Sequence, residues 1–454
     1  MNLTKKNKVY RFLLTPPKIL VIGFAIIILI GTILLALPIA SSTGSSLSLM
    51  NALFMATSAT CVTGLAVIDP GTELSTFGEI VILSLCQIGG LGFTTMATLI
   101  ALVFNKRISV KERLILQQAM NHGSMEGIVR LMRKVIFYSL TIELVGAILL
   151  SIRFALDMPV GQALYYGLFH SISSFTNVGL DIFGSIHGPF SSFNPYVNDP
   201  YVNLVIILLI FLGGIGFIVI SDLLGFRKSR KLSLHSKVVL SVSLALVVIG
   251  SIVIYIFEYT NVNTLQGLSQ PDKIMASTLQ SVTTRSGGIT TLDIPMLRQS
   301  TQFFMIIWMF IGAAPGSTGG GIKVTTFAIL IGAMYTMARG REDVVFFRYR
   351  ISKEVVYKAI TLTLLSFLLV IAFTMLLSVT EDHQFLTLLF EATSAFGTCG
   401  LSMGLTSELS FVGKLAITFL MFLGRLGPLT LAYALSPKPQ KESFRYPEGK
   451  ITIG

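Results

Sequence analysis

The sequence predicts an all-α polytopic membrane protein, with four tandem helix–pore-helix–helix repeats around a central pore and eight transmembrane helices. Three observations support this fold class: an apolar composition, long apolar segments and an internal repeat. Of the 454 residues, 53% are hydrophobic and 12% are charged. Soluble domains carry about 25% charged residues, so an ordinary soluble enzyme is excluded. A disordered chain is excluded as well, because disorder requires low hydrophobicity and high net charge.

Eight apolar segments are long enough to cross a bilayer, which takes about 20 residues for about 30 Å of hydrocarbon. They lie at 18–39, 77–104, 135–156, 201–225, 237–257, 301–336, 356–379 and 410–435. The first is too long for a cleaved signal peptide and has no small-residue cleavage site. We therefore expect each segment to form one membrane span.

The basic residues predict how these spans are oriented. Most of the 34 Lys and Arg residues lie in the N-terminal segment, in the segments after spans two, four and six, and in the C-terminal tail. Basic residues are enriched in cytoplasmic loops, so both termini are expected to be cytoplasmic in a multi-pass protein of the cell membrane. The net charge of +12 is then explained by topology, and no nucleic-acid partner is expected.

The domain boundaries follow from the spans and the loops between them. The four repeats are predicted at 18–104, 133–225, 237–336 and 353–435. Cytoplasmic segments are predicted at 1–17 (N-terminus), 105–132, 226–236, 337–352 and 436–454 (C-terminal tail). Each repeat starts on the cytoplasmic side, so the four repeats are parallel to one another.

The internal repeat is carried by a short half-polar segment between the two spans of each unit. Each segment has about three helical turns, then a few small or polar residues, then Gly and an aliphatic residue; these glycines are Gly64, Gly179, Gly288 and Gly400. They recur at intervals of 109 to 115 residues. The segments are too short to span, which is typical of re-entrant helices. Irregular backbone at membrane depth is tolerated where it lines a watery cavity or is buried in protein.

Four such stretches around one axis predict a selectivity filter for a monovalent cation. Rings of backbone carbonyls replace the hydration shell of a monovalent cation, and glycine permits the positive φ and close approach that such a ring needs. The metal ion would be held through carbonyls near the four glycines. The candidate filter residues are Thr60, Cys61, Val62, Thr63 and Gly64; Thr176, Asn177, Val178 and Gly179; Arg285, Ser286, Gly287 and Gly288; and Gly397, Thr398, Cys399 and Gly400.

Span six contains a segment that cannot remain helical, because Gly costs about 1 kcal/mol and Pro about 3 kcal/mol in a helix interior. Its residues are Gly312, Ala313, Ala314, Pro315, Gly316, Ser317, Thr318, Gly319, Gly320 and Gly321. At mid-membrane depth below the filter, this segment is predicted to be a polar loop across the pore that acts as a gate. A simple kink without a gating role is the alternative.

Ionisable residues inside spans are functional candidates. Arg425 is predicted to lie near the gate loop, where it would donate to loop carbonyls; a structural ion pair or snorkelling is the alternative. Arg285 is expected to point behind the filter toward a carboxylate, with Glu391 as the candidate partner. Asn177 is a candidate for a hydrogen bond behind the filter, and Glu143 in span three is interpreted as structural.

Two glycine-rich motifs superficially resemble nucleotide-binding loops. Lys323 follows Ile322 and precedes Val324, so the Gly-Lys-Ser/Thr sequence of a P-loop is not present. The segments beginning at Gly89 and Gly213 lack a third glycine in a βαβ context. Close packing of helices through small residues is the better interpretation of both.

The fourfold repeat, the four filter-type glycines and the segment from Gly312 to Lys323 together resemble the Trk/Ktr/HKT superfamily of potassium transporters, in particular a Ktr-type membrane subunit. The resemblance covers almost the whole chain. It implies a homodimer, with a pore in each protomer, seated on a cytosolic ring of nucleotide-binding (RCK-type) regulatory subunits. It also implies that glycine at all four filter positions favours K+ and that Na+ activates transport. The third stretch departs from the usual Arg-Thr-Ala-Gly, with Gly287 in place of Ala, which affects the filter register in repeat 3.

The resulting prediction is a channel-like potassium uptake subunit that is driven by the membrane potential, and not an enzyme. An alternating-access cation symporter is the alternative, which the parallel repeats and the scarcity of mid-span acids disfavour. A membrane-embedded enzyme would need a nucleophile–base pair or metal ligands inside the spans, and His170 has no such partner in the sequence. No soluble domain is expected, so no organic cofactor is assigned to this chain and nucleotide control must come from a partner.

Overall fold

The computed structural model describes residues 16–92, 95, 128–428 and 430. Most of the predicted N-terminal segment and of the loop at 105–132, the end of repeat 1 and the C-terminal tail lie outside these residues. The described part is helical, apart from one short hairpin of β1 (Val345–Phe346) and β2 (Tyr349–Arg350) on the loop at 337–352. The all-α class expected from the composition is therefore confirmed.

Each repeat has an outer helix, a shorter pore helix that folds back, and a second outer helix. Repeat 1 contains α2 (Pro16–Ala36), α3 (Leu49–Thr60) and α5 (Thr76–Leu91), and repeat 2 contains α8 (Ile128–Phe154), α9 (Val160–Phe175), α11 (Pro200–Gly214) and α12 (Phe217–Ser229). Repeat 3 contains α13 (Leu234–Glu258), α14 (Gln270–Arg285), α15 (Gln299–Phe310) and α16 (Val324–Ala338), and repeat 4 contains α17 (Lys353–Thr380), α18 (Phe385–Gly397) and α20 (Phe411–Leu426). The connecting loops carry α4 (Pro70–Glu73), α10 (Gly184–His187), α19 (Leu405–Glu408) and the 3-10 turns η1 (Pro38–Ala40), η2 (Asn194–Tyr196) and η3 (Ile294–Met296).

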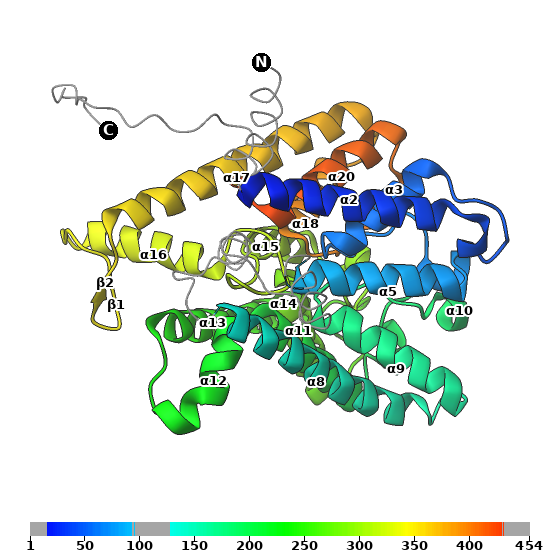
Figure 1. Ribbon diagram of the computed structural model, residues 1–454, viewed down its shortest axis with the longest axis horizontal. Coiled ribbons are helices and arrows are strands. Elements are labelled where there is room, and N and C mark those ends of the chain that lie inside the picture. Colours follow the sequence, from blue (N-terminus) through cyan, green and yellow to red (C-terminus); the bar gives the residue numbers. More distant parts are fainter. Residues whose placement is uncertain (1–15, 93–94, 96–127, 429, 431–454) are drawn as a thin grey trace, which may run out of the picture.

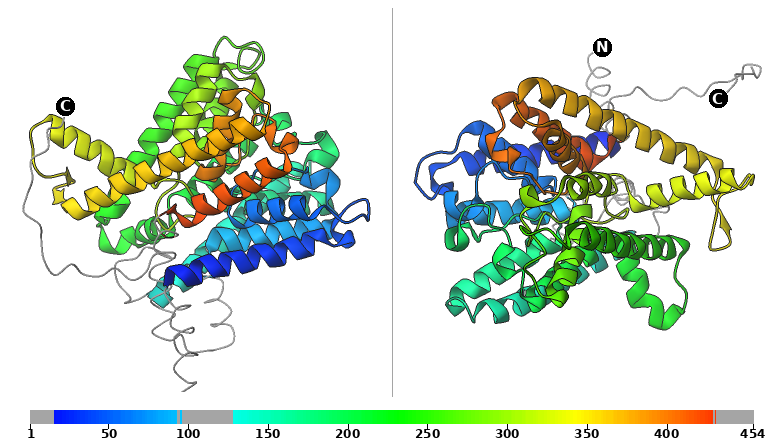
Figure 2. Two further views of the ribbon diagram at one scale, coloured as in Figure 1. Left: turned by 90° about the horizontal axis from the view of Figure 1, so that it is seen from above. Right: turned by 180° about the vertical axis from the view of Figure 1, so that it is seen from behind.

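The four repeats form a closed circuit. Helix α5 of repeat 1 contacts α9 of repeat 2, and α11 of repeat 2 contacts α14 of repeat 3. Helix α15 of repeat 3 contacts α18 of repeat 4, and α20 of repeat 4 returns to α3 of repeat 1. In Figures 1 and 2 the repeats follow one another from blue to red around the middle of the molecule, where α14, α15 and α18 lie. This arrangement places the ends of the four pore helices near one axis.

The ends of the pore and outer helices are specified locally. Ser48, Ser75, Ser233, Ser269 and Ser410 precede helices, and the side chain of each accepts a hydrogen bond from the backbone N–H three residues on. Such caps satisfy donors that have no partner within the helix. Three of these serines precede apolar outer helices, whose buried faces pack on the pore helices.

Four described helices are by themselves long and apolar enough to cross a bilayer: α2, α8, α13 and α17. A fifth crossing results if α11 and α12 are counted together, although they are bent by 101°. The other three expected spans correspond to α5, to the interrupted pair α15 and α16, and to α20, which are shorter. The arrangement fits eight spans, and that number stays a prediction.

Three second helices break at equivalent glycines. Gly92, Gly216 and Gly427 follow α5, α11 and α20, with φ of 81°, 89° and 80° and ψ of 134°, 145° and 136°. This left-handed, extended backbone is readily adopted by glycine and strained for other residues. The fourth span expected at 201–225 is therefore bent, because the chain turns sharply at Gly216.

Candidate ion pathway

The structure brings the four repeat glycines together into one ring. Gly64, Gly179, Gly288 and Gly400 have φ of 89°, 80°, 65° and 89°. A Cβ atom on Gly64 would overlap the carbonyl oxygen of Val178, and one on Gly179 would overlap that of Gly287. One on Gly288 would lie 3.0 Å from the oxygen of Cys399, and one on Gly400 would overlap that of Thr63. Each repeat thus touches the next, and the ring closes.

The carbonyl oxygens in these contacts come from the same position in each repeat. Thr63, Val178, Gly287 and Cys399 each immediately precede the ring glycine of their own repeat, and their carbonyls lie against the glycine of a neighbouring repeat. Carbonyl dipoles gathered in this way can replace the water around a monovalent cation. The pore helices end just before the ring, so their partially negative C-terminal ends also lie there.

Three serines hold the strands that are predicted to form the filter, and sequence reasoning missed them. In repeats 1, 2 and 4 the N–H of Thr63, Val178 and Cys399 donates to the carbonyl of Ser58, Ser173 and Ser394, at 2.8, 3.0 and 2.9 Å. The Ser58 hydroxyl also accepts from Gly64 N at 3.0 Å. The available signal was a serine six residues before the glycine in three of the four repeats.

The third filter stretch is built differently. Val62, Asn177 and Thr398 lie two residues before their glycines, with left-handed φ of 61°, 60° and 48°. The equivalent Ser286 has φ 172°, which is extended backbone, and Val282 takes the place of the serine. The N–H of Ile289 donates instead to Gly287 O at 2.8 Å. The unusual sequence of this stretch therefore coincides with a real difference in its backbone.

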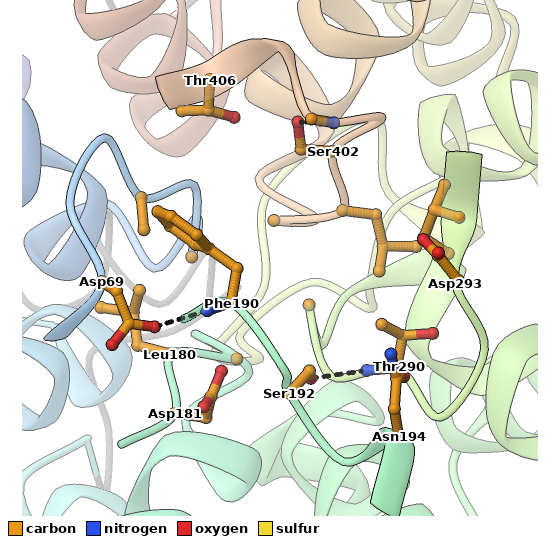
Figure 3. Close-up of a pocket in the computed structure, with 18 of the residues that line it drawn as sticks. Asp69, Leu180, Asp181, Phe190, Ser192, Asn194, Thr290, Asp293, Ser402 and Thr406 are labelled. Carbon is orange, nitrogen blue, oxygen red and sulfur yellow. Dashed lines mark hydrogen bonds between the residues drawn. The ribbon is translucent and has the colours of Figure 1, made fainter. Parts of the chain in front are cut away.

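An acidic cavity of about 250 Å³ lies over the ring, with all four glycines in its lining. Asp69, Asp181 and Asp293 line it from three different loops (Figure 3). Asp69 is held in place by Thr72 N (2.9 Å), Thr72 Oγ1 (3.0 Å) and Phe190 N (2.7 Å). Asp181 accepts from Phe183 N at 3.1 Å. Burial and the nearby Asp69 raise the pKa of Asp181 to about 7, so this carboxyl titrates near neutral pH.

The interruption expected in span six is present. Helix α15 ends at Phe310, α16 begins at Val324, and the intervening loop contains the predicted residues Gly312–Gly321. The loop is fastened to repeat 2 by backbone bonds from Ala314 N to Gly214 O (2.9 Å) and from Phe217 N to Gly316 O (3.0 Å). The second of these bonds comes from the residue after the break at Gly216. The bend in repeat 2 therefore serves as a support for the loop.

Two basic side chains hold adjacent carbonyls of the loop. Arg425 donates through Nη1 to Thr318 O and through Nη2 to Gly89 O, with a longer contact of 3.4 Å to Gly90 O. Lys323 Nζ donates to Gly319 O at 2.7 Å. Arg425 was predicted near the loop, and the structure places it there, joining repeats 1, 3 and 4. The contact of Lys323 was not predicted, because from the sequence this residue was considered only as part of a P-loop, which it does not form.

Asn177 and Thr398 connect the predicted filter to the loop. With its amide oriented to satisfy all its neighbours, Asn177 Oδ1 accepts from Thr318 Oγ1 at 3.0 Å and from Gly214 N at 3.2 Å. Its Nδ2 donates to Ser174 O and Ile210 O, both at 3.1 Å. On repeat 4, Gly320 N donates to Thr398 Oγ1 at 2.8 Å. The bond expected for Asn177 behind the filter exists and reaches the loop.

The expected pairing of Arg285 with Glu391 is wrong. Arg285 does turn away from the ring, but its Nη1 and Nη2 donate to O and Oγ of Ser243 on α13, at 3.3 and 3.4 Å. Glu391 accepts from Ser402 at 2.8 Å and also from Thr406, so it holds the loop that follows the fourth filter strand. The two residues lie on different pore helices, and each finds its partner behind its own strand.

Other sequence interpretations agree with the contacts. Glu143 accepts from Gln87 Nε2 at 3.1 and 3.0 Å, which ties α8 to α5. A Cβ on Gly89 would overlap Thr60 O, and one on Gly213 would overlap Phe175 O. These glycines thus allow α5 and α11 to pack against the ends of their own pore helices, as close helix packing predicts.

Comparison with known proteins agrees with this architecture. Residues 14–446 match the model of the TrkH family, described as cation transport protein. The chain is 42% identical to Ktr system potassium uptake protein B of Bacillus subtilis, over 99% of both chains. It is 38% identical to Ktr system potassium uptake protein D of the same organism, over 97% of this chain and 98% of the other. It is 35% identical to potassium/sodium uptake protein NtpJ of Enterococcus hirae, over the whole of both chains.

The fold also matches a solved structure. The crystal structure of the potassium transporter TrkH from Vibrio parahaemolyticus superposes with a TM-score of 0.72, covering 91% of this chain and 85% of the other. Sequence identity between the two is 18%, so this likeness concerns the fold alone. The family match and the relatives at 35–42% identity extend over nearly the whole chain. The chain therefore belongs to the TrkH family of cation transport proteins.

Proposed function

We propose that this chain is the potassium-translocating membrane subunit of a bacterial Ktr-type uptake system and that ions cross it as through a channel. The observation that carries the proposal is the ring of equivalent carbonyls, from Thr63, Val178, Gly287 and Cys399, at the base of an acidic cavity. Potassium in the names of the relatives supports the choice of ion. The membrane potential drives uptake, since about 100 mV supplies about 2.3 kcal/mol per unit charge.

Flux measured in liposomes tests this proposal. The purified chain should accumulate potassium when the lumen is negative and release it when the potential is reversed. No stoichiometric proton movement should accompany the flux. Accumulation against the potential that depends on a proton gradient would instead identify an alternating-access symporter, and sodium flux equal to potassium flux would contradict a potassium-selective ring.

The loop at 312–321 is the gate in this proposal. It is held between repeat 2 and Arg425, and charge-assisted bonds of this kind contribute about 1.5–3 kcal/mol each. A loop that rests on a few such bonds can be displaced by modest forces from a cytosolic partner. If the loop is only a structural kink, weakening its contacts will lower the amount of folded protein and leave the flux per folded molecule unchanged.

The working assembly is a homodimer with one pore per protomer, seated on a cytosolic ring of RCK-type nucleotide-binding subunits. It lies in the cell membrane with both termini in the cytoplasm, and sodium activates transport. The relatives that are named as components of a Ktr system support an assembly with several components. Light scattering of the purified chain tests the dimer. Uptake with and without a ring subunit, and with and without sodium, tests the two forms of regulation.

A further inference from the structure

We infer that the gate loop also sets the ion preference of the filter, and that Thr318 is a specificity-determining residue outside the filter itself. The inference rests on the proposed filter and gate. It adds that the two are mechanically one unit, joined by hydrogen bonds from Thr318 and Gly320 to filter strands two and four.

The first connection joins the loop to repeat 2. Thr318 is buried, and its hydroxyl lies within hydrogen-bonding distance of three acceptors: Asn177 Oδ1 (3.0 Å), Gly213 O (3.1 Å) and Phe175 O (3.4 Å). Asn177 belongs to the filter strand, and Phe175 ends the pore helix that precedes it. The hydroxyl has one proton, so it donates to one acceptor at a time. Whichever acceptor it uses, the bond ties the loop to repeat 2 beside the filter.

The second connection joins the loop to repeat 4. Gly320 N donates to Thr398 Oγ1 at 2.8 Å, and both residues are buried. A Cβ on Gly320 would overlap the Thr398 side chain and lie 3.1 Å from Gly424 O. The backbone of the loop therefore lies directly against the fourth filter strand, with no room for a side chain between them.

The two filter residues that the loop contacts have left-handed backbones, with φ of 60° for Asn177 and 48° for Thr398. Asparagine adopts this conformation more readily than other non-glycine residues. β-Branched Thr398 is especially unfavourable there. Val62 has the same backbone in repeat 1, with φ of 61°, so the fold of each repeat favours this conformation, and the bonds from Thr318 and Gly320 add to what holds it in repeats 2 and 4. Moving the loop removes them and allows both strands to relax.

The positions of the two strands in the ring make this relaxation important. The ring glycines contact one another in the order of repeats 1, 2, 3 and 4, so strands two and four lie across the axis from each other. Loosening two opposite strands changes the width of the carbonyl ring rather than displacing it sideways. Selectivity among monovalent cations depends on the size of this cage or the arrangement of its carbonyls, so the ion preference should depend on the position of the loop.

The test compares Thr318→Val with Thr318→Ser in liposomes, measuring both the rate of potassium flux and the potassium-to-sodium permeability ratio. Valine keeps the shape but removes the hydroxyl, whereas serine keeps the hydroxyl. Loss of one hydrogen bond should lower the ratio about fivefold in Thr318→Val, and Thr318→Ser should stay within about twofold of the parent. Ser317→Ala is the matched control, because the Ser317 hydroxyl bonds to Ala314 O within the loop itself. It should leave the ratio unchanged, because both bonds between the loop and the filter strands are kept.

The outcomes separate this inference from the proposed function. If Thr318→Val conducts faster with an unaltered ratio, the loop is a gate that is independent of the filter, and the inference is wrong. If valine and serine shift the ratio equally, the hydroxyl bond is not the cause, and the inference is wrong as well. A parent protein that does not prefer potassium would overturn the proposed filter instead.

A binding measurement provides the test if Thr318→Val conducts too poorly. Binding is reciprocal: if the bonds from the loop to the filter raise the affinity for potassium, bound potassium in turn stabilises the filter with these bonds formed. Potassium should therefore raise the unfolding temperature of the parent more than sodium does. This difference should disappear in Thr318→Val and in Thr398→Val, and persist in Thr398→Ser. If both valine variants keep the full difference between the potassium and sodium shifts, the bonds of Thr318 and Thr398 do not shape the ion site.

Discussion

At the scale of single residues, the ring glycines differ in how closely their neighbours approach. A Cβ on Gly64 would overlap Val178 O, whereas one on Gly288 would lie 2.9 Å from that oxygen and 3.0 Å from Cys399 O. Both positions have positive φ, which costs a non-glycine residue about 1–2 kcal/mol. A side chain at either position should therefore distort one quarter of the ring, and the distortion should be greater at Gly64.

We accordingly expect Gly64→Ser to lower the preference for potassium over sodium by about tenfold and Gly288→Ser to lower it less. Competitive uptake of the two ions into liposomes measures the preference. Gly161→Ser is the control, because Gly161 lies near the start of pore helix α9 and a Cβ there would meet no atom within 4 Å. Equal selectivity in the parent and in both ring variants would contradict the filter assignment.

We expect Asp181 to make entry to the proposed pathway sensitive to the pH on the side of the acidic cavity. Its raised pKa, about 7, means that the carboxyl is largely neutral at pH 6 and charged at pH 8. The charged form attracts cations into the cavity above the ring, so potassium uptake at subsaturating concentration should rise with pH. An upper estimate is about fivefold, since a unit charge about 4 Å away contributes about 1 kcal/mol in water.

The variant Asp181→Asn should remove this pH dependence and keep uptake at the low-pH level. Asp382→Asn, which changes an exposed acid beyond α17, should leave the pH profile unchanged. Initial rates at external pH 6, 7 and 8, with the internal pH fixed, provide the measurement. A profile that remains equally steep in Asp181→Asn would assign the titration to another group.

The sequence predicted that the four repeat glycines come together, and the structure brings them into one ring, whereas the predicted partner of Arg285 was wrong. The ring positions follow from glycine spacing, because only a repeated structure requires glycine at the same place four times. The Arg285–Glu391 pair was wrong because charge alone does not tell which side of a pore helix faces which neighbour. Ser243 and Thr406 are the actual partners, and neither differs in the sequence from many other hydroxyl residues.

At the scale of elements, the second helices of repeats 1, 2 and 4 share one design. Gly90, Gly214 and Arg425 occupy equivalent positions, two residues before the breaks at Gly92, Gly216 and Gly427. Repeats 1 and 2 thus have glycine where repeat 4 has the arginine that holds the loop. The interruption at Gly312–Gly321 was predictable from its composition. The breaks in the other helices were missed, because apolar residues continue on both sides of Gly216.

Removing the arginine should loosen the loop. Arg425→Ala should raise potassium flux by about tenfold, because each lost charge-assisted bond is worth about 1.5–3 kcal/mol. Arg425→Lys keeps the charge without the planar fork that reaches Thr318 and Gly89 together, so its flux should be intermediate. Flux per folded protein in liposomes, with size-exclusion chromatography as the folding check, decides the outcome.

Combining Arg425→Ala with deletion of Gly316–Gly321 tests whether both act on the same latch. If they do, the double variant should conduct little faster than the deletion alone. Strictly additive effects would mean that Arg425 acts elsewhere, for example by holding Gly89 O and the end of α5. Poor folding of Arg425→Ala, with a penalty independent of the loop, would support the purely structural alternative.

At the scale of the whole molecule, one loop connects all four repeats. The loop belongs to repeat 3. It is bonded to Gly213 and Gly214 in repeat 2 and to Thr398 and Arg425 in repeat 4. It reaches repeat 1 through Arg425, which also donates to Gly89 O. A force applied to α16, which follows the loop directly, would therefore reach the glycine ring through these bonds. In the proposed orientation, this path would serve regulation from the cytoplasmic side.

Deleting Gly316–Gly321 should raise the flux of the chain alone and make it independent of a ring subunit. Growth of an uptake-deficient bacterium on limiting potassium, with and without a ring subunit, measures this dependence. Cells with the intact chain should need the regulatory ring subunit for rapid growth, and cells with the deletion variant should grow equally well without that subunit. A deletion protein that inserts normally but still requires the regulatory ring subunit would rule out the loop as the regulated element.

The single arginine and single loop also bear on how such a molecule can evolve. In a pore assembled from four identical subunits, every subunit would bring its own loop and its own Arg425, and four loops cannot occupy one axis. Fusion of the four units into one polypeptide frees each to accumulate different mutations. Gly90 and Gly214 can stay small while the fourth copy acquires a cation, and among the described residues the third copy is the one whose second helix is interrupted by a glycine-rich insert. Asymmetry below the ring is thus a property that gene duplication within one chain makes available and that a homotetramer cannot reach.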